Sequence, residues 1–550
     1  MQELSGEQKG PIQAAWRSAC AHVSGGALGT TASVLERHGA LGELLATSRS
    51  TAITELARRT GLDPAYAQLA AQLLATQGLA DCARLGSDDA SVTLTDDGRT
   101  WARYAAAYDR YEVVLDDAVA LRAALRRDAG AVPDVREVGA SQRARHALGE
   151  APAPLAERLR RHLRGPLVAV AVRGLAEARA FGRIARAPLG WCPVDALALP
   201  ESARDACMEL LAEEGWLARD GDLVHVTPEG LAGARWMALY GYLVGYLGVL
   251  RQVPALLGAD AAPAADPTVV KGDDDRTLLL AGKAQVFARG GLREPLEQLV
   301  RSVFDTQPIA AQPRVLLDVS VGDGSVLVAL YERIVRDTVR GSALREHPLL
   351  LVGLAGSSVA RAQAAERLAR LGVPCLLLQH GIEDPDAIAR DLERAGIDLH
   401  DALMVAKTCI HGRRLLGAHG VVLPPATDEA RPGVFITPDG TLVAPRDLED
   451  DLAAFFARWA PWLGRHGMIA ADTHAVPPAV AAASWPVNVV THVAATHGYS
   501  AQYLVEADVF RRAARRGGFV SRRAHDLGTT LVGATTMTLD HLVVANAARA

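Results

Sequence analysis

The sequence predicts a mostly helical first half with two winged-helix-like units, followed by a Rossmann-like α/β second half. Two observations indicate this architecture. A pattern of helices and turns occurs twice before residue 236, and apolar runs of strand length alternate with amphipathic helices after Arg314. The 550 residues are enough for two to four domains, each with its own core. We expect these domains at residues 1–127, 128–267 and 268–550.

The repeated pattern begins at Ile53 and ends at Gly98 in its first copy, and it runs from Val194 to Gly230 in its second. Each copy predicts two helices, a glycine that ends the second helix, and a short hairpin. A Leu/Val-Thr-x-x-Gly helix start follows the hairpin. In the second copy the first of these helices is expected at Val194–Leu199. This order of elements is typical of a winged-helix unit.

The chain around the second copy has simpler patterns. Residues 128–153 mix charges with turn formers, which indicates a linker with some helix. Trp236–Leu257 predicts one long apolar helix, and Ala259–Pro267 has the composition of a linker. The last domain is expected to start near Asp273, with a helix that reaches Phe304.

Winged-helix units often bind DNA, but these two lack the charges for it. The second helix of the first copy, Pro64–Thr76, has no positive side chain, and Arg204 is alone in its counterpart. A reader of the major groove needs basic phosphate contacts, and the net charge of the chain is −5. We therefore expect no nucleic-acid partner, and we interpret the units as packing and substrate-lid modules.

Composition also bears on compartment. The polar segment 1–11 has no apolar core of a signal peptide, and no uninterrupted apolar run reaches the roughly 20 residues of a membrane span. The six cysteines include no C-x-x-C pair, which fits a reducing cytoplasm. We expect a cytoplasmic protein without a membrane partner.

The second half predicts a doubly wound, mainly parallel sheet. Helices are expected between the strands, for example at Ala360–Leu371 and Pro385–Ala395. Ligands on such sheets bind beyond the carboxyl ends of the strands, where the strand order reverses. The expected strands are Val315–Val319, Leu349–Leu354, Cys375–Gln379, Ala402–Val405, Met468–Thr473 and Thr530–Met537.

The end of the first expected strand has the pattern of a nucleotide-cofactor loop. The apolar run Val315–Leu317 leads to Asp318 and then to a glycine-rich turn that opens a helix. Glycines in such a turn let the backbone approach a cofactor without a Cβ in the way. The candidate cofactor-binding residues are Asp318, Ser320, Gly322 and Gly324.

Several ordered segments resemble one family. They are "GDDDRTLLLAGKAQVFARGG", "DVSVGDGSVL", "EDPDAIARDL", "RPGVFITPDG", "DTHAVPP" and "THGYSAQYLVEADVF". Together they resemble the metal-dependent C-methyltransferase domains of apratoxin-type polyketide synthases, in the class I S-adenosylmethionine (SAM) methyltransferase superfamily. The resemblance covers roughly Trp191 to Phe519. It implies a helical lid, a class I methyltransferase core, SAM as cofactor and a mononuclear iron-type metal site.

The resemblance fails at three SAM anchors. Ser320 stands where the family has the first glycine of the loop, and the second strand ends at Ala355 without the carboxylate that would bind the ribose. After the third strand, Gly381 takes the place of an adenine-binding Asp, and Glu383 and Asp384 are shifted along the chain. Two or three lost charge-assisted hydrogen bonds would weaken SAM binding by roughly 10³-fold. Loss of SAM use is favoured, and retained SAM binding through other side chains is the alternative.

The resemblance implies a metal site at His411, His474 and Gln502, a donor set that suits a divalent iron or manganese ion. Ile410 stands where the family has an Asp beside the first histidine. If no metal binds, the expected acid–base residues are His474, His497, Tyr499 and Asp472.

Two cations, Arg413 and Lys407, are candidates to bind a carboxylate, phosphate or sulfate on a small-molecule substrate. Three functions remain open. The first is a natural-product enzyme that works without SAM and catalyses ring closure, elimination or metal-assisted chemistry on a small amino or acyl substrate. The second is a SAM-dependent, metal-assisted C-methyltransferase that acts on a malonyl-like unit held by a carrier protein. The third is a scaffold subunit for a partner enzyme, or a winged-helix regulator.

Overall fold

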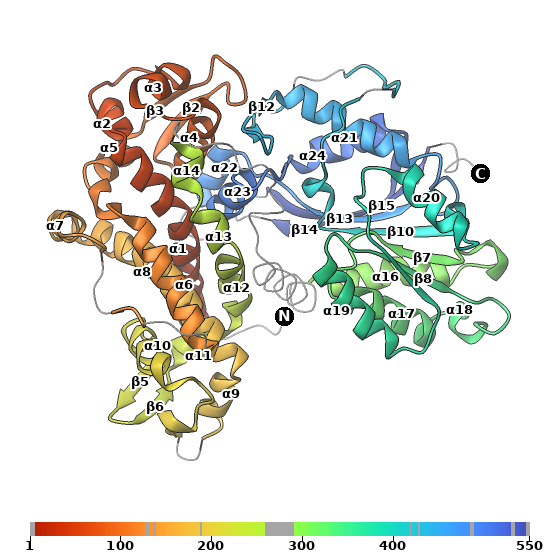
Figure 1. Ribbon diagram of the computed structural model, residues 1–550, viewed down its shortest axis with the longest axis horizontal. Helices are drawn as coiled ribbons and strands as arrows, with labels where there is room; N and C mark the ends of the chain where they lie inside the picture. The colour runs from red at the N-terminus through yellow and green to blue at the C-terminus, as the bar shows by residue number, and fades with distance from the viewer. Residues whose placement is uncertain are drawn as a thin grey trace. The chain divides into compact units, whose positions relative to one another are not determined.

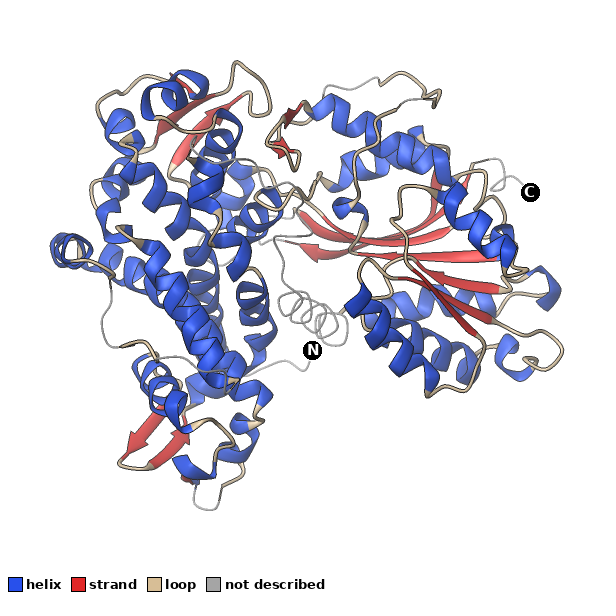
Figure 2. Ribbon diagram, viewed as in Figure 1, coloured by secondary structure: helices blue, strands red, loops and turns tan. Residues whose placement is uncertain are grey.

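The computed structural model describes residues 6–126, 132–135, 139–187, 190–258, 291–418, 420–426, 430–484, 489–529 and 534–545. The chain forms two compact units. The helical unit comprises Met1–Gly282, Pro438–Thr441 and Pro478–Ser500, and the sheet unit comprises Lys283–Thr437, Leu442–Pro477 and Ala501–Ala550. Figures 1 and 2 show the helices of the first and the large sheet of the second. The expected linker at Ala259–Pro267 and the segment 272–290 lie outside the described residues, and the three domain boundaries stay predictions.

Two long helices, α1 (Gly6–Arg37) and α8 (Ala153–Glu177), pack together in the helical unit. Glycines let their backbones approach closely. A Cβ on Gly25 would lie 2.3 Å from the Cα of His162, and a Cβ on Gly165 would lie 2.2 Å from the carbonyl oxygen of His22. Further helices of this unit include α2 (Ala40–Leu45), α5 (Asp96–Ala102), α6 (Tyr111–Leu125), α7 (Gln142–Glu150), α9 (Ala180–Ala185), α11 (Pro228–Gly233), α22 (Pro478–Ser484) and α23 (Val490–Gly498).

The sequence repeat is confirmed as a structural repeat. Each copy has a three-stranded antiparallel sheet, with strand order β1-β3-β2 in the first copy and β4-β6-β5 in the second. The elements of the first copy are β1 (Thr51–Ala52), α3 (Ile53–Thr60), α4 (Pro64–Thr76), β2 (Ala80–Ala83) and β3 (Ser91–Leu94). Those of the second copy are β4 (Cys192–Pro193), α10 (Glu201–Glu213), β5 (Leu217–Asp220) and β6 (Leu223–Val226).

The Thr-x-x-Gly motif that ends each copy has a physical explanation. Thr95 and Thr227 cap the helices that follow, because each hydroxyl accepts a hydrogen bond from the amide of the glycine three residues later. That glycine also lies against backbone. A Cβ on Gly98 would lie 1.8 Å from the carbonyl oxygen of Leu79, and one on Gly230 would lie 2.1 Å from that of Trp216.

The predictions of two helices in this unit are wrong. Val194–Leu199 contains only a single 3₁₀ turn, Val194–Ala196. Trp236–Leu257 is divided into α12 (Met237–Gly245), α13 (Leu247–Leu250) and α14 (Val253–Leu257). Pro254 has no amide hydrogen to continue a helix from the preceding turn, so an apolar composition alone does not make this segment one rod.

The sheet unit contains a seven-stranded sheet with the order β14-β15-β13-β10-β7-β8-β9. Five strands are parallel, whereas β15 is antiparallel to both of its neighbours. The strand order reverses at β7, which lies between β10 and β8. The strands are β7 (Val315–Asp318), β8 (Leu350–Leu354), β9 (Cys375–Leu378), β10 (Ala402–Lys407), β13 (Met468–Thr473), β14 (Phe519–Thr529) and β15 (Thr535–Val544). The first five confirm the expected strands to within two residues.

Helices cover both faces of this sheet, as Figure 2 shows. Val315 and Leu317 of β7 belong to a core with α20, α21 and α24, and the residues between them face the opposite side because side chains alternate along a strand. A two-stranded hairpin, β11 (Phe435–Ile436) and β12 (Leu442–Val443), precedes α21. The helices are α16 (Arg293–Phe304), α17 (Ser325–Asp337), α18 (Val339–Ser342), α19 (Ser358–Ala369), α20 (Pro385–Arg394), α21 (Pro445–Trp459) and α24 (Ala507–Arg516).

The single final strand expected at Thr530–Met537 is wrong. The structure has two long antiparallel strands, β14 and β15, and residues 530–533 lie outside the described part. Most of β14 is exposed and polar, because it is the edge strand of the sheet, so it lacks the apolar run that marked the other strands. Among the described residues, no helix is long and apolar enough to cross a membrane.

Candidate functional site

The carboxyl end of β7 lies where the strand order reverses, and it holds the first cluster of candidate residues. Asp318 is fully buried, and one of its oxygens, Oδ1, accepts a hydrogen bond from the Ser320 amide at 2.9 Å and lies 3.3 Å from the Ser320 hydroxyl. Its other oxygen, Oδ2, is buried and has no hydrogen-bond partner in the described part of the chain. Burial raises the pKa of Asp318, and the charge of Lys407 and the bonds from Ser320 oppose that effect.

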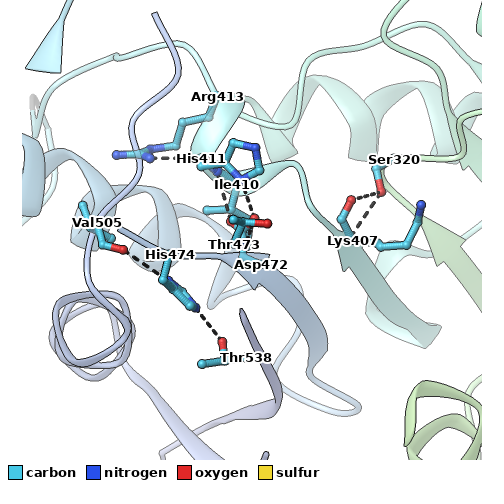
Figure 3. A network of polar contacts seen from close by, with 10 residues as sticks. All are labelled: Ser320, Lys407, Ile410, His411, Arg413, Asp472, Thr473, His474, Val505 and Thr538. Carbon is cyan, nitrogen blue, oxygen red and sulfur yellow. Dashed lines mark hydrogen bonds and ion pairs between the residues drawn. The ribbon is translucent and has the colours of Figure 1, made fainter. Parts of the chain in front are cut away.

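Ser320 also joins β7 to its neighbour β10. The Ser320 hydroxyl lies 2.9 Å from the carbonyl oxygen of Lys407 and 3.2 Å from the Lys407 amide, so it can donate to the first and accept from the second (Figure 3). A glycine, which the resemblance would place here, could make neither bond. The side chain at position 320 therefore ties together the two strand ends that flank the expected cofactor site.

The glycines of this loop keep the geometry expected of them. Gly322 and Gly324 have φ of 55° and 80°, a conformation that residues with a Cβ rarely adopt. The turn is held from outside as well, because Arg367 of α19 donates to both the carbonyl and the carboxylate of Asp323. The loop thus keeps its backbone shape although its first glycine is Ser320.

The second and third SAM anchors have no carboxylate in a suitable place. Ala355, just after β8, is fully buried and donates its amide to the Leu378 carbonyl. Glu383 is buried and accepts the amide of Arg414 at 2.6 Å, whereas Asp384 caps α20 by accepting the Ala387 amide. Both carboxylates that might replace the adenine anchor thus bond to the protein's own backbone, and the residues present do not fit SAM in its usual mode.

A second polar cluster lies at the ends of β10 and β13 (Figure 3). Asp472 of β13 accepts the backbone amide of His411 at 3.0 Å with one oxygen, and its other oxygen lies 2.5 Å from Nδ1 of the same histidine. Burial alone would raise the pKa of Asp472. The imidazoles of His411 and His474 and the bonds that the carboxylate accepts outweigh burial, and they hold that pKa below its usual value.

His474 follows β13 and is buried. Its Nδ1 lies 3.3 Å from the Val505 carbonyl, and its Nε2 lies 2.8 Å from the Thr538 hydroxyl. Because a carbonyl can only accept, the proton of the neutral ring is on Nδ1, and Nε2 accepts from Thr538. Burial lowers the pKa of His474 to about 4, and the nearby Asp472 only partly offsets this. The ring is therefore neutral at physiological pH.

The predicted metal ligands are only partly assembled. Gln502 lies beside the turn that carries His411, since its Oε1 would be 3.8 Å from a Cβ on Gly412. Both ring nitrogens of His474, however, are engaged by protein groups. No group of three His, Cys, Asp or Glu side chains with a metal-site arrangement occurs among the described residues. As the side chains lie, these residues do not form the expected set of ligands, and the metal site stays a prediction that requires His474 to give up Thr538.

Arg413 is a structural cation in this arrangement. It is buried and forms an ion pair with Asp451, with 2.8 Å between Nη2 and Oδ2, and it also donates to the Ile410 carbonyl. Asp451 further accepts the amides of Leu416 and Gly417, so this pair anchors the chain after the His411 turn. The predicted contact between Arg413 and a substrate stays untested.

His497 and Tyr499 belong to the helical unit, whereas the other candidate residues belong to the sheet unit. The Tyr499 hydroxyl lies 3.1 Å from that of Thr31, and the Tyr499 ring stacks on Tyr66 with 6.0 Å between centroids. His497 bonds to the Val493 carbonyl of its own helix at 2.8 Å. Burial raises the pKa of Tyr499 well above its usual value, so the hydroxyl stays protonated. In the helical unit both side chains serve its packing.

Three contacts of these clusters could not be read from the sequence. They are the bonds of Ser320 to Lys407, of His474 to Thr538 and of Arg413 to Asp451.

Comparison with known proteins shows what the sheet unit is similar to. Residues 275–533 match the family model described as the AprA MT2-like domain. No curated protein sequence matches the chain. Among solved structures, the mitomycin 7-O-methyltransferase MmcR is 14% identical to this chain. The match covers 72% of this chain and 98% of the MmcR chain, with a TM-score of 0.43. The CurJ carbon methyltransferase is 13% identical, with coverages of 68% and 89% and a TM-score of 0.32.

The CMeT domain of the citrinin polyketide synthase is similarly distant, at 14% identity, with coverages of 68% and 88% and a TM-score of 0.33. The family match, and not these distant likenesses, carries the assignment. It agrees with the seven-stranded sheet and with the glycine-rich turn after β7. Residues 275–533 of this chain are thus similar to the AprA MT2-like methyltransferase domain.

Proposed function

We propose that this chain is a natural-product enzyme that uses a methyltransferase fold without SAM. In this proposal it binds a small amino or acyl substrate and catalyses ring closure, elimination or metal-assisted chemistry on it. A carrier protein that delivers the substrate and a partner subunit are further parts of the proposal. The match of residues 275–533 to the AprA MT2-like domain supports an enzyme of this fold, and the altered cofactor anchors support the loss of SAM.

The observation that carries the proposal is the bond between Ser320 and Lys407. A ligand of a parallel sheet binds beyond the carboxyl ends of the strands, at the point where the strand order reverses. Here the Ser320 hydroxyl satisfies both the amide and the carbonyl of Lys407. After β8, at Ala355, SAM would also find no carboxylate to bind its ribose.

A fold built for methyl transfer suits ring closure for a geometric reason. Methyl transfer holds a nucleophile, a carbon and a leaving group in one line, and an intramolecular substitution needs the same alignment. In ring closure by an amine, the new N–C bond forms as the bond from that carbon to the leaving group breaks, and the amine loses a proton. The chain's own part would be to bind both ends of the substrate and exclude water.

The deciding experiment is a calorimetric titration of the full chain with SAM, together with a metal assay of the purified protein. The proposal expects no SAM binding up to millimolar concentration. Micromolar binding would refute it. If metal is found, His474→Ala and Gln502→Ala should each remove it, and an unchanged metal content in both variants would refute the predicted ligands.

A second candidate is a SAM-dependent C-methyltransferase that acts on a carrier-bound malonyl-like unit. The retained glycine geometry at Gly322 and Gly324 and the family match favour it. The same titration separates it from the first, because methyl transfer requires SAM to bind. A scaffold subunit would bind neither SAM nor a substrate.

A further inference from the structure

The two copies of the repeat differ on the outer faces of their small sheets. In the second copy, Val224 and Val226 of β6 are buried, so the residues that alternate with them point away from the core. This outer face, which we call the wing face, is formed by Trp191, Pro193, Ala218, Asp220, Leu223 and His225. Trp191 is 36% exposed and Leu223 is 39% exposed. Two large apolar side chains of the wing face are therefore in contact with solvent.

The ring of Trp191 is held in place on this face. It packs on the His225 ring, with 5.5 Å between the two centroids. Nδ1 of His225 lies 2.7 Å from the carbonyl oxygen of Gly190, and because a carbonyl can only accept, Nδ1 is the donor. One histidine thus fixes both the ring and the backbone before it. A side chain that is already ordered loses little entropy on binding, and tryptophan is enriched among the residues that dominate binding energy at protein interfaces.

The first copy has the same strands, but its outer face is polar. The strand register places Ser91 at the position of Leu223, and it places Ser50 at the position of Trp191. The fold of the repeat therefore does not require apolar side chains at these two positions. Neighbouring apolar side chains that are exposed and that the fold does not need indicate an interaction surface.

The charge of the second copy selects the kind of partner. Residues 191–233 contain nine acidic and two basic side chains, a net charge of −7 in a chain whose total is −5. Asp220 lies opposite Leu223 on the wing face, and Asp222 lies in the turn between these two residues. The two arginines of this segment pair with other aspartates, so no ion pair within the described part of the chain neutralises Asp220 or Asp222.

This charge disfavours three other occupants of the wing face. Nucleic acids and anionic membranes would be repelled. A second copy of the chain, placed face to face, would bring two segments of net charge −7 together, and like charges across an interface cost several kcal/mol. The occupant that remains is a protein surface with apolar side chains among cations.

We propose that the wing face docks a basic protein partner, which packs an apolar side chain against Trp191 and Leu223 and places cations beside Asp220 and Asp222. Apolar burial supplies the affinity, and the opposite charges steer and orient the encounter. The inference deepens the proposed function at one point, because it gives the partner subunit a chemistry, and it rests on that part of the proposed function alone.

A fluorescent peptide tests this on the full chain by anisotropy. The probe is a helical peptide with leucine on one face and lysine on the other, and its counterpart has glutamate in place of lysine. We expect the lysine peptide to bind at least tenfold more tightly, because Asp220 and Asp222 attract the first peptide and repel the second. Equal binding of the two peptides would overturn the inference.

Two double variants locate the site. Trp191→Ser/Leu223→Ser introduces the serines that the first copy has, so we expect it to fold, and it should weaken binding of the lysine peptide at least tenfold. Val335→Ser/Val422→Ser is the matched control, because it removes two exposed apolar side chains from the sheet unit, and it should leave binding unchanged. An equal loss in both variants, or no loss in the first, would contradict the proposal.

A third double variant tests the charges without changing the apolar side chains. Asp220→Lys/Asp222→Lys should reverse the preference, so that the glutamate peptide binds more tightly than the lysine peptide. An unchanged preference would mean that the attraction arises elsewhere on the chain, and the inference would be wrong.

Two further measurements separate the alternatives. By light scattering we expect the natural chain and Trp191→Ser/Leu223→Ser to have the same oligomeric state. Self-association that this variant abolishes would assign the wing face to a second copy and rule out the basic partner. SAM titration reports on the sheet unit instead. If neither peptide binds, only the partner is wrong, whereas micromolar SAM binding refutes the SAM-independent function whatever the peptides do.

Discussion

Asp318 and Asp472 are two buried aspartates at the carboxyl ends of strands in one sheet. They differ in how many of their carboxylate oxygens accept a hydrogen bond. Asp472 uses both oxygens, and His411 and the Thr473 amide are its partners. Asp318 uses one oxygen, toward Ser320, and leaves the other without a partner in the described part of the chain. The pKa of Asp472 is held below its usual value although burial would raise it, whereas burial raises the pKa of Asp318.

The difference shows which of the two stabilises the fold. Hydrogen bonds that a buried carboxylate accepts favour its charged form over its neutral form. A buried oxygen without a partner costs stability instead. We therefore infer that Asp472 stabilises the turn at His411, and that Asp318 contributes less to stability.

The largest expected effect is that of Asp472→Asn. Removing one partner of a buried charged pair costs about 3–5 kcal/mol. The side-chain amide of asparagine has only one oxygen, so it cannot accept both hydrogen bonds that Asp472 accepts from His411. We expect the urea midpoint of the sheet unit to fall accordingly, as measured by circular dichroism. Asp391→Asn is the control, because Asp391 also bonds a histidine, His380 at 2.7 Å, but lies nearer the surface. Its effect on the urea midpoint should be clearly smaller, because water screens an exposed pair.

The next largest effect concerns the affinity for SAM at the strand end that carries Asp318. The double variant Ser320→Gly/Gly356→Asp removes the hydroxyl that joins β7 to β10 and adds a carboxylate after β8. A Cβ on Gly356 meets nothing within 4 Å, so the new side chain has room. One restored charge-assisted bond contributes about 1.5–3 kcal/mol, so SAM should bind at least tenfold more tightly than to the natural chain. Calorimetry that finds equal affinity would show that Ser320 does not keep SAM out.

The two aspartates should respond to pH in opposite directions. The folded-state pKa of Asp472 is lowered, so its contribution to stability is complete above the unfolded pKa of about 3.9 and is lost as pH falls through the folded value. The folded-state pKa of Asp318 is raised, so its contribution is complete below about 3.9 and is lost as pH rises through the folded value.

Melting temperatures of Asp472→Asn and Asp318→Asn, each compared with the natural chain from pH 3 to 8, test this. Each group changes stability by at most about 1.4 kcal/mol per pH unit. The deficit of Asp472→Asn should shrink in acid, and Asp318→Asn should gain relative to the natural chain as pH rises. Parallel curves for the two variants would contradict the assignment.

The smallest effect is that of Asp318→Asn on stability at neutral pH. Asparagine keeps an oxygen for the Ser320 amide and removes a charge that burial disfavours, so we expect a change within about 1 kcal/mol, in the stabilising direction. A loss as large as that of Asp472→Asn would mean that the two carboxylates play the same structural role.

Much of the sheet could be predicted from the sequence, because its central strands are buried on both faces and appear as apolar runs. The edge strand β14 could not, since its exposed residues carry the polar pattern of a loop. The contacts that define the site were also hidden. The bonds of Ser320 to Lys407 and of His474 to Thr538 join residues 87 and 64 apart in the chain, and they depend on strand register.

His497 and Tyr499 show another limit of sequence reasoning. They lie only a few residues before Gln502, and this closeness suggested one site for all three. The chain leaves the helical unit at Ser500 and enters the sheet unit at Ala501, so neighbours in sequence belong to different units. No local pattern marks that boundary.

The membership of Pro478–Ser500 in the helical unit has a consequence for synthesis. Helices α22 and α23 pack on α4 and α1, so the core of the helical unit is incomplete until residue 500 has been made. The ribosome needs about 10–40 s to add the residues between Gly282 and Pro478. By then every strand of the large sheet except β14 and β15 exists. The first part of the chain to be synthesised therefore cannot complete its core until most strands of the large sheet have also been made.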